Sequence, residues 1–405
     1  MNSLRQHSRY RGAALLTVLF ILMVISVLTL GVLVRTDMDL AGSRNVPLRM
    51  QMDELAQSGM EYSKVLIGNQ IPDANVVGAI YSLSDIIPAY EGSEYYQLAI
   101  VPKDDGIAET PNYWYTVDCE MFEEDGTEIA NTRLQGDLRL PCIAYWQGGA
   151  QNILYTTKIY GDVYCTNAMD IFGRVYGDIY STTTGSVKSV LMGAIFGQIY
   201  TNWPKPPVEF PTLKYEWFDG CYYVDSEDSY WGQEIVPDDC NELEMPGLNP
   251  GNDMKVYYHY GDLRLNGDFT AADIGTLAVS GNLTLAGETS LEIVSENYFP
   301  ALIVGGDLIL DGNNCLLQAD GLVQVGNHID MGGNMNGKIT INGSLCVYNN
   351  GIVNCSGSSS ITIQIDPIAG TVRIWDNLNS ELHRWSPAGG GFYKSITRVA
   401  PDTTP

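Results

Sequence analysis

A histidine and an aspartate lie two residues apart in a glycine-led segment, residues 326–331, and form the first candidate for a polar site. If this segment is a strand with the same register as the similar segments before it, His328 and Asp330 point inward. A buried imidazole and a buried carboxylate persist only when they satisfy each other or serve a function. A slip of one residue would instead bury Ile329 and Met331 and leave His328 at least partly exposed. We expect the slip, because it buries two apolar side chains in place of two polar ones.

Motifs for catalysis, cofactors and metals are missing from the sequence. None of the four histidines lies in a zinc-protease motif, and no nucleophile elbow, phosphate-binding loop or clear dinucleotide fingerprint is present. We therefore expect no catalytic residue, no cofactor and no metal ion. A polysaccharide hydrolase that uses two aspartates stays open as an alternative, because any two of the many aspartates could meet in the fold.

Tryptophans, prolines and acidic residues are concentrated between residues 201 and 250. Tryptophans beside carboxylates could stack on sugar rings, and the carboxylates could hold calcium. The interpretation that we prefer is a solvated loop, closed by a disulfide, which projects from one face of a repeating structure. The cysteines nearest to each other in sequence are the candidate disulfide partners: Cys221 with Cys240, and Cys346 with Cys355.

A repeat must position these residues. Its unit is glycine, a small polar residue and then alternating aliphatic residues, and its clearest copies begin at Gly161, Gly177, Gly197, Gly261, Gly281, Gly306 and Gly343. The alternation points apolar side chains to one side of a short strand, and glycine with Asp or Asn supplies tight corners. A turn of about 20 residues cannot bury its own inner face, so successive turns must stack.

The repeat predicts a mainly β protein with a right-handed parallel β-helix, a solenoid, in preference to an antiparallel sandwich with glycine turns. The leucines at 263, 283, 308 and 345 should stack as one inward column, and residues 265, 285, 310 and 347 as the next. The repeats resemble right-handed parallel β-helices, and the run from Val175 to Tyr180 is also similar to bactofilin-type polymer-forming repeats.

The N-terminus contains a long uncharged segment. Three arginines lie within residues 1–12, and no charged residue occurs from Ala13 to Val34. A helix of this length spans roughly 33 Å, which is enough for the core of a bilayer. It is too long for a cleaved signal and too apolar on every face for a soluble helix. The positive-inside rule places residues 1–12 in the cytoplasm and the rest of the chain outside.

The run from Arg11 to Leu19, RGAALLTVL, resembles the N-terminus of type IV pilin-like proteins, especially PilX-like minor pilins and the K-type minor pseudopilin of type II secretion. In that family a prepilin peptidase cuts after the glycine, so the resemblance implies a cut between Gly12 and Ala13. Thr17 stands where the family usually has glutamate. The K-type pseudopilin also lacks this glutamate, so the resemblance implies a minor subunit. The alternative is an ordinary signal anchor that has a glycine before it by chance.

Apolar residues at helical spacing continue after the span. Leu48, Met52, Leu55, Gly59, Tyr62 and Leu66 follow each other at intervals of three or four residues. Pro47 should kink or restart this helix. The stripe could pack on other subunits of a filament or on the globular part of the same chain.

The sequence divides into a cytoplasmic leader (1–12), a transmembrane helix (13–34), an amphipathic helix (35–69), a small mixed or β region (70–150), first repeats (151–200), an insertion (201–250), further repeats (251–370) and a C-terminal cap and tail (371–405).

The function that we expect is that of a structural component of the bacterial inner membrane, which crosses the membrane once and displays a β-helix outside the cytoplasm. Its roles would be filament assembly, adhesion or surface scaffolding, and its partners the membrane, a prepilin peptidase and other pilin-like subunits. The alternative is an anchored β-helix that binds or hydrolyses a polysaccharide. The formal charge of −26 argues against binding of nucleic acid.

Overall fold

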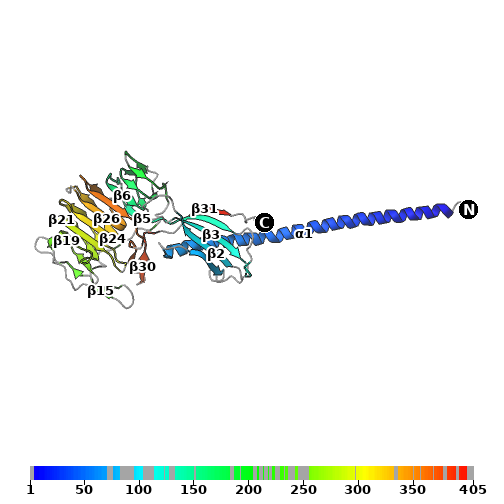
Figure 1. Ribbon diagram of the computed structural model, residues 1–405, viewed down its shortest axis with the longest axis horizontal. Coiled ribbons are helices and arrows are strands. Elements are labelled where there is room, and N and C mark those ends of the chain that lie inside the picture. The colour runs from blue at the N-terminus through cyan, green and yellow to red at the C-terminus, as the bar shows by residue number, and fades with distance from the viewer. Residues whose placement is uncertain are drawn as a thin grey trace.

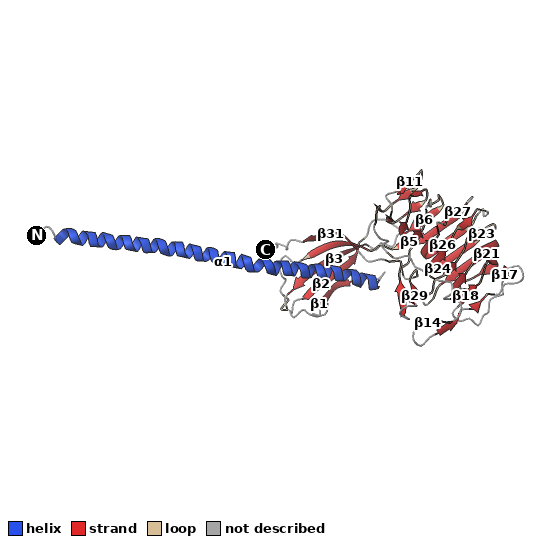
Figure 2. Cartoon of the chain, turned by 180° about the vertical axis from the view of Figure 1, so that it is seen from behind, coloured by secondary structure: helices blue, strands red, loops and turns tan. Residues whose placement is uncertain are grey.

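The computed structural model describes residues 4–70, 76–82, 95–103, 114–122, 124–126, 133–149, 152–182, 187–191, 193–203, 208, 213, 218, 221–223, 229–231, 233–235, 242–244, 255–296, 298–332, 336–349, 351–355, 357–367, 369–376, 381–388 and 392–398. The protein is mainly β, with 52% strand, and combines a β-solenoid of about 7 turns with an N-terminal helix. The predicted fold class is therefore confirmed. Figures 1 and 2 show the helix at one end, the solenoid at the other and a small sheet between them.

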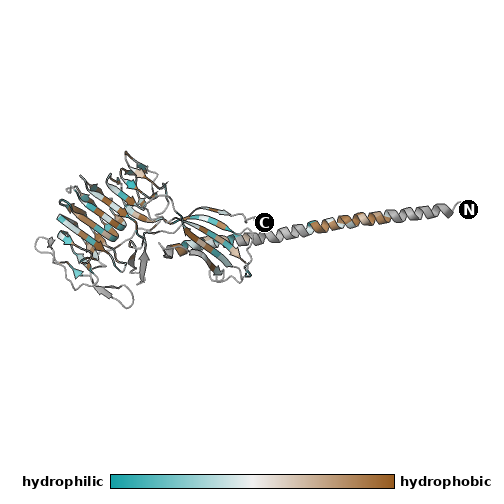
Figure 3. Ribbon diagram, in the orientation of Figure 1, coloured by the Kyte–Doolittle hydropathy of each residue, from teal (hydrophilic) through white to brown (hydrophobic). Residues whose placement is uncertain are grey.

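Helix α1, Leu4–Gln70, is 67 residues long and continues through Pro47, so the expected kink or restart is wrong. A proline in a long helix removes one backbone hydrogen bond, which the remaining ladder tolerates here. The segment Thr17–Thr36 has a mean hydropathy of 2.8 and is 0% buried, which makes it a candidate membrane span; a signal sequence has the same properties. It forms the apolar stretch of the helix in Figure 3.

The C-terminal part of α1 packs on the sheet of its own chain. Ala56, Met60, Ser63 and Ile67 are fully buried and recur at helical spacing, whereas Tyr62 and Leu66 of the predicted stripe lie half-buried at its edge. The contact face is thus rotated by about one residue from the predicted one. Leu48, Met52 and Leu55 lie outside the residues whose side chains are described.

Gly59, one of the residues of the predicted apolar stripe, permits this close packing. A Cβ atom at this position would lie 2.7 Å from Sγ of Cys119 in strand β3, so any larger residue would push the helix away from the sheet.

The small sheet is antiparallel and has five strands in the order β1-β2-β3-β4-β31. The strands are β1 Val76–Ser82, β2 Tyr95–Pro102, β3 Trp114–Phe122, β4 Leu134–Arg139 and β31 Phe392–Arg398. Alternate residues of β2 and β3 are buried toward the helix, among them Leu98 and Val117. Strand β31 comes from the end of the chain and pairs with β4, so part of the expected C-terminal cap completes the first sheet instead.

The solenoid has three faces, and each face is a stack of parallel strands or half-strands from different coils. Face one contains β16 Gln233–Glu234, β18 Val256–His259, β20 Thr276–Val279, β22 Leu302–Val304, the second halves of β24 Leu316–Val325 and β26 Lys338–Val347, then β5 Ile143–Gln147, β7 Asp162–Cys165, β10 Ile179–Ser181 and β13 Ile199–Tyr200.

Face two contains β17 Glu242–Glu244, the first halves of β19 Leu263–Phe269 and β21 Leu283–Val294, then β23 Leu308–Asp311, β25 Ile329–Met331 and β27 Val353–Cys355. Strands β8 Met169–Ile171 and β11 Val187–Ser189 form a separate parallel pair.

Face three contains the second halves of β19 and β21, the first halves of β24 and β26, then β28 Ser360–Gln364, β6 Thr157–Tyr160, β9 Arg174–Val175 and β12 Ala194–Ile195. Two antiparallel pairs lie outside the faces: β14 Cys221–Tyr223 with β15 Ser229–Trp231, and β29 Val372–Asp376 with β30 Glu381–Trp385.

The coils do not stack in the order of the sequence. Strand β26, near the end of the repeats, pairs in parallel with β5, at their beginning, and β28 pairs likewise with β6. The chain therefore enters and leaves the solenoid in the middle of the stack, between β4 and β31 of the small sheet. The solenoid is an insertion into that sheet, and it starts at β5, before the expected boundary at residue 151.

The segment after β13 connects the two ends of the stack. Val208, Leu213 and Phe218 are buried against the outer side of face one. Nε2 of Gln324, on face one, donates a hydrogen bond to the backbone carbonyl of Leu213 at 3.1 Å. These described residues thus cover a face, which corrects the expected loop that projects into solvent. Most of the acidic residues of 201–250 lie outside the described residues.

The inward columns are confirmed in part. Leu263, Leu283 and Leu308 are paired in register and buried, and residues 265, 285 and 310 form the neighbouring column. Leu345, however, pairs with Val323 and Tyr145 on face one. Val347 lies on face one as well, in register with Val325.

The reason for this error is that glycine followed by an aliphatic strand occurs at two different corners of the solenoid. Gly161, Gly321 and Gly343 share a φ of 142–145° at the corner between faces three and one. The glycines at 261, 281 and 306 precede strands of face two instead. A sequence motif that is common to two corners cannot assign a strand to its face.

Candidate functional site

His328 and Asp330 lie where the one-residue slip places them. Ile329 and Met331 are fully buried, and His328 is exposed, so the expected slip is confirmed. Ile329, not His328, is in register with Leu308. Asp330 is half-buried on the outer side, where its Oδ1 accepts hydrogen bonds from the amide of Gly332 and, at 3.0 Å, from Nδ2 of Asn354.

His328 belongs to a ladder of side-chain acceptors at the corner between faces one and two. Each member accepts the backbone N–H at the equivalent position of the next coil: Asp262 from Asn282 at 2.7 Å, Asn282 from Asp307 at 2.7 Å, Asp307 from His328 at 3.0 Å, and Nδ1 of His328 from Ile352 at 2.8 Å. The acceptor role of Nδ1 requires the neutral ring with its proton on Nε2. The polar position of the repeat therefore satisfies amides that the corners leave unpaired.

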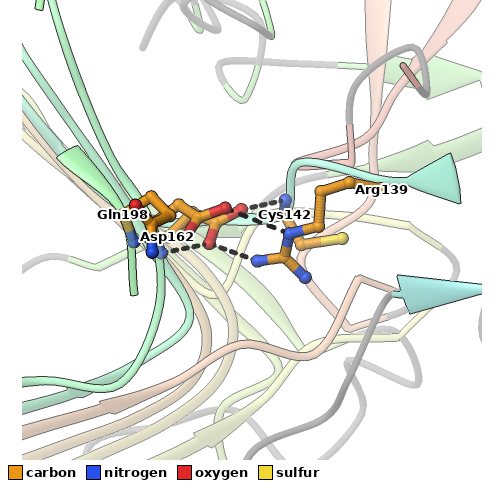
Figure 4. Close-up of polar contacts among 5 residues, drawn as sticks. Arg139, Cys142, Asp162 and Gln198 are labelled. Carbon is orange, nitrogen blue, oxygen red and sulfur yellow. Dashed lines mark hydrogen bonds and ion pairs between the residues drawn. The ribbon is translucent and has the colours of Figure 1, made fainter. Parts of the chain in front are cut away.

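Side chains that accept the backbone N–H of the next coil also occur at another corner, where the solenoid joins the small sheet. At the start of β7 and of β10, Oδ1 of Asp162 accepts the amide of Asp178 at 2.8 Å, and Oδ1 of Asp178 accepts the amide of Gln198 at 2.7 Å. Oδ2 of Asp162 accepts a hydrogen bond from the backbone amide of Cys142 at 2.9 Å, directly before strand β5, where the chain enters the solenoid. Figure 4 shows Arg139 reaching this group from the end of β4.

Arg139 forms buried ion pairs with both aspartates. Its Nη2 lies 2.7 Å from Oδ1 of Asp162, and its Nε lies 3.3 Å from Oδ2 of Asp178. Arg139 is 9% exposed, Asp162 0% and Asp178 4%. One cation that belongs to the sheet is therefore enclosed with two anions that belong to successive coils, and we call these three residues the junction cluster.

Burial and charge set the ionisation of the junction cluster. Removal of Asp162 from water raises its pKa, Arg139 lowers it, and the neighbouring charge of Asp178 raises it again, so that the pKa is about 6. The two aspartates hold the pKa of Arg139 above its usual value against the opposing effect of burial. Because one guanidinium cannot neutralise two carboxylates, the cluster readily takes up one proton.

The junction cluster fixes the position of the solenoid relative to the sheet. Its groups are enclosed and engaged with one another, so the arrangement orients two parts of the chain and offers no open coordination or nucleophilic position. We did not predict this cluster from the sequence. Its signal was the repeated Gly-Asp at 161–162 and 177–178, where a charge recurs at a corner next to buried strands.

The remaining predicted positions are only partly described. Gly12 and Ala13 lie in the helical backbone of α1, but their side-chain surroundings are outside the description. Cys346 and Cys355 are both free thiols, which corrects the second candidate disulfide: Cys346 lies on face one and Cys355 on face two. Cys240, in the first candidate pair, lies outside the described residues. Among those residues, no group of histidine, cysteine and acidic side chains could hold a metal ion.

Comparisons with known proteins do not assign a family. No protein-family model and no curated protein matches the chain. Among solved structures, the chain is similar to an ice-binding protein from an Antarctic ascomycete, Antarctomyces psychrotrophicus, with 16% identity, 56% of this chain and 95% of that chain covered, and a TM-score of 0.27. It is also similar to the competence-associated pilin ComZ from Thermus thermophilus, with 11% identity, 80% and 86% covered, and a TM-score of 0.19. Both scores are too low to support a conclusion about function.

Proposed function

We propose that the protein is a membrane-anchored, pilin-like minor structural component that displays its solenoid outside the cytoplasm. The observation that carries the proposal is the division of α1 into two parts. The segment Thr17–Thr36 is 0% buried and apolar, while Ala56, Met60 and Ile67 of the same helix are buried in the small sheet. An exposed apolar segment of this length needs a membrane or other helices around it.

The rest of the fold suits a display role. The small sheet is bound to the helix on one side and holds both connections to the solenoid on the other (Figure 1). The proposal includes no catalytic step. A rigid connection between the anchor and the displayed domain suits filament assembly, adhesion and scaffolding, and the ion pairs of the junction cluster support such a connection.

Processing at Gly12 tests this proposal. We expect that co-expression with a prepilin peptidase gives a mature chain that starts at Ala13, and that Gly12→Val blocks the cut, because the resemblance places glycine directly before the cleaved bond. Gly31→Val is the matched control: Gly31 lies in the same helix with no atom within 4 Å of its Cβ position, so it should leave processing unchanged. N-terminal sequencing and intact mass of the extracted protein give the result. A chain that starts at Met1 in all three proteins would contradict the pilin-like assignment.

A further inference from the structure

A surface on the first coils in the sequence, on face three at β6, β9 and β12, combines exposed cations with aromatic rings. On face three, Lys158 of β6 and Arg174 of β9 are exposed and lie directly opposite each other in register. Among the described residues neither forms an ion pair, although the chain has far more acidic than basic residues. Two like charges on neighbouring strands repel each other, so this pair costs stability unless an anion binds there.

Aromatic side chains flank the two cations on both sides. On one side, Tyr160, Tyr176 and Phe196 stack from coil to coil, with ring centroids 4.6 Å apart at each step and interplanar angles of 6° and 1°. On the other side, Tyr155 packs against Phe172 with centroids 5.1 Å apart. We call this surface the aromatic–cation strip; it consists of Tyr155, Phe172, Lys158, Arg174, Tyr160, Tyr176 and Phe196.

The strip is open to solvent at its edges. Tyr155 is 53% exposed and Phe196 is 48% exposed. The coil beyond Arg174 places the small residue Ala194 opposite it, which leaves space above the guanidinium. Asp170, on β8, already pairs with Lys188 at 3.6 Å. Lys158 and Arg174, which have no ion-pair partner among the described residues, are therefore accessible to an external anion.

We propose that the aromatic–cation strip binds an acidic polysaccharide, a polymer of uronic acid residues. Carboxylates at regular intervals match Lys158 and Arg174, and the guanidinium can bind a carboxylate through two parallel hydrogen bonds. Neighbouring strands are about 4.8 Å apart, close to the length of one pyranose in an extended chain. The apolar C–H faces of the sugars can pack on the exposed rings of Tyr155 and Phe196. A polymer that runs across the coils would thus present one carboxylate to each cation.

Single-stranded nucleic acid fits the strip less well. Its bases need open aromatic faces, but the rings of Tyr160 and Tyr176 are stacked on each other and on Phe196. Two cations on a chain with a net charge of −26 also give little attraction for a densely charged phosphate backbone. This inference goes beyond the proposed function and does not depend on it, since binding at face three requires neither the membrane nor a filament.

Binding of fluorescent oligogalacturonate to the full chain in detergent micelles tests the inference. We expect Lys158→Gln and Arg174→Gln each to weaken binding by about tenfold, since each removes a charge-assisted hydrogen bond, and the double variant to abolish it. Phe196→Ala should weaken binding less. Lys338→Gln is the matched control. Lys338 is exposed on the same face, but its register partners are Leu316 and Ser360, which are neither aromatic nor cationic, so binding should be unchanged.

Neutral oligogalactan of equal length should not bind, which separates the carboxylates from the sugar rings. Absence of oligogalacturonate binding, or binding that survives in the double variant, would overturn the inference. Equal or tighter binding of oligothymidylate, lost in the same double variant, would overturn it in favour of nucleic acid. All variants replace exposed side chains, so unchanged circular dichroism and melting temperature will show that they are folded.

Discussion

The junction cluster holds one more negative charge than positive charge when all three of its groups are ionised. Arg139 contacts Asp162 and Asp178 at the same time, and the cluster is almost closed to water. Breaking a buried ion pair by removing one partner is strongly destabilising, because it leaves an uncompensated charge. Protonation of the excess carboxylate should therefore change the stability of the connection between the sheet and the solenoid.

The pH dependence follows from the pKa of Asp162. This pKa is about 6 in the folded protein and about 3.9 in an unfolded chain, so the folded state binds more protons between these values. The contribution of Asp162 to stability is therefore fully present below about pH 4 and is lost as the pH rises through about 6. Asp178→Asn removes the competing charge and should lower the pKa of Asp162.

As the pH rises from 4.5 to 7, two values chosen to bracket roughly the shifted pKa, the wild type should lose more unfolding free energy than the variant. The difference in stability between variant and wild type should therefore shift in favour of the variant at the higher pH. Chemical denaturation at the two pH values, followed by the near-ultraviolet signal, measures the difference. The lost contact with Nε of Arg139 lowers stability at both pH values and so does not affect the comparison. Asp170→Asn, at a half-buried aspartate outside the junction cluster, serves as the control and should show no such change. An equal effect of Asp178→Asn at both pH values would contradict this explanation.

At the scale of the elements, the solenoid coil is a strand–corner unit whose inner side chains pack on the coils above and below. Leu285 of β21 is fully buried between Leu265 and Leu310, to which it is paired in register. Thr284, its neighbour in the same strand, points outward and is half-buried. Substitutions at these two positions therefore compare the contribution of the inner column to stability with that of an outward side chain in the same strand.

Leu285→Ala should lower the free energy of unfolding of the solenoid by about 2–5 kcal/mol, because it removes buried methyl groups and leaves a cavity between coils. Thr284→Ala should change it by no more than about 0.5 kcal/mol, as is usual for a side chain without buried contacts. Urea unfolding of the two variants, followed by far-ultraviolet circular dichroism, compares them directly. Equal losses for both would mean that the column does not carry the stability of the coil.

At the scale of the whole molecule, β31, the last described strand, belongs to the small sheet, whose other strands all precede the solenoid in the sequence. Strand β31 pairs with β4, which also pairs with β3, so that β4 has a neighbour on both sides. Without β31, β4 would become an open sheet edge next to the connection that enters the solenoid. The sheet therefore depends on a segment that is made after the entire solenoid.

Removal of β31 should loosen the sheet and leave the solenoid folded. We expect truncation after Ala388 to make residues 133–142 sensitive to protease, because β4 loses one of its two pairing strands, while residues 255–364 stay resistant. Truncation after Arg398 removes no described residue and is the matched control. Limited proteolysis with mass spectrometry locates the cuts. Resistance of residues 133–142 in the shorter chain would show that β31 is dispensable for the sheet.

Local patterns in the sequence predicted local structure well. The uncharged run after Ala13 predicted a long apolar helix, and alternation after glycine predicted stacked parallel strands with Leu263, Leu283 and Leu308 in one column. The preference for burying Ile329 over His328 was also correct. Each of these depends only on side-chain chemistry and on the period of a helix or a strand, both of which the sequence contains.

Tertiary structure alone decided the order of the coils, the return of β31 to the first sheet and the meeting of Arg139 with two aspartates of the solenoid. Leu345 shows the reason. Its motif matches that of Leu308, but it lies at another corner, because the face of a strand depends on where the coil before it ended. Stacking between coils is a contact between distant residues, and many orders of similar coils satisfy the same local pattern. The physical choice among them is made by long-range pairing and burial, which no single repeat encodes.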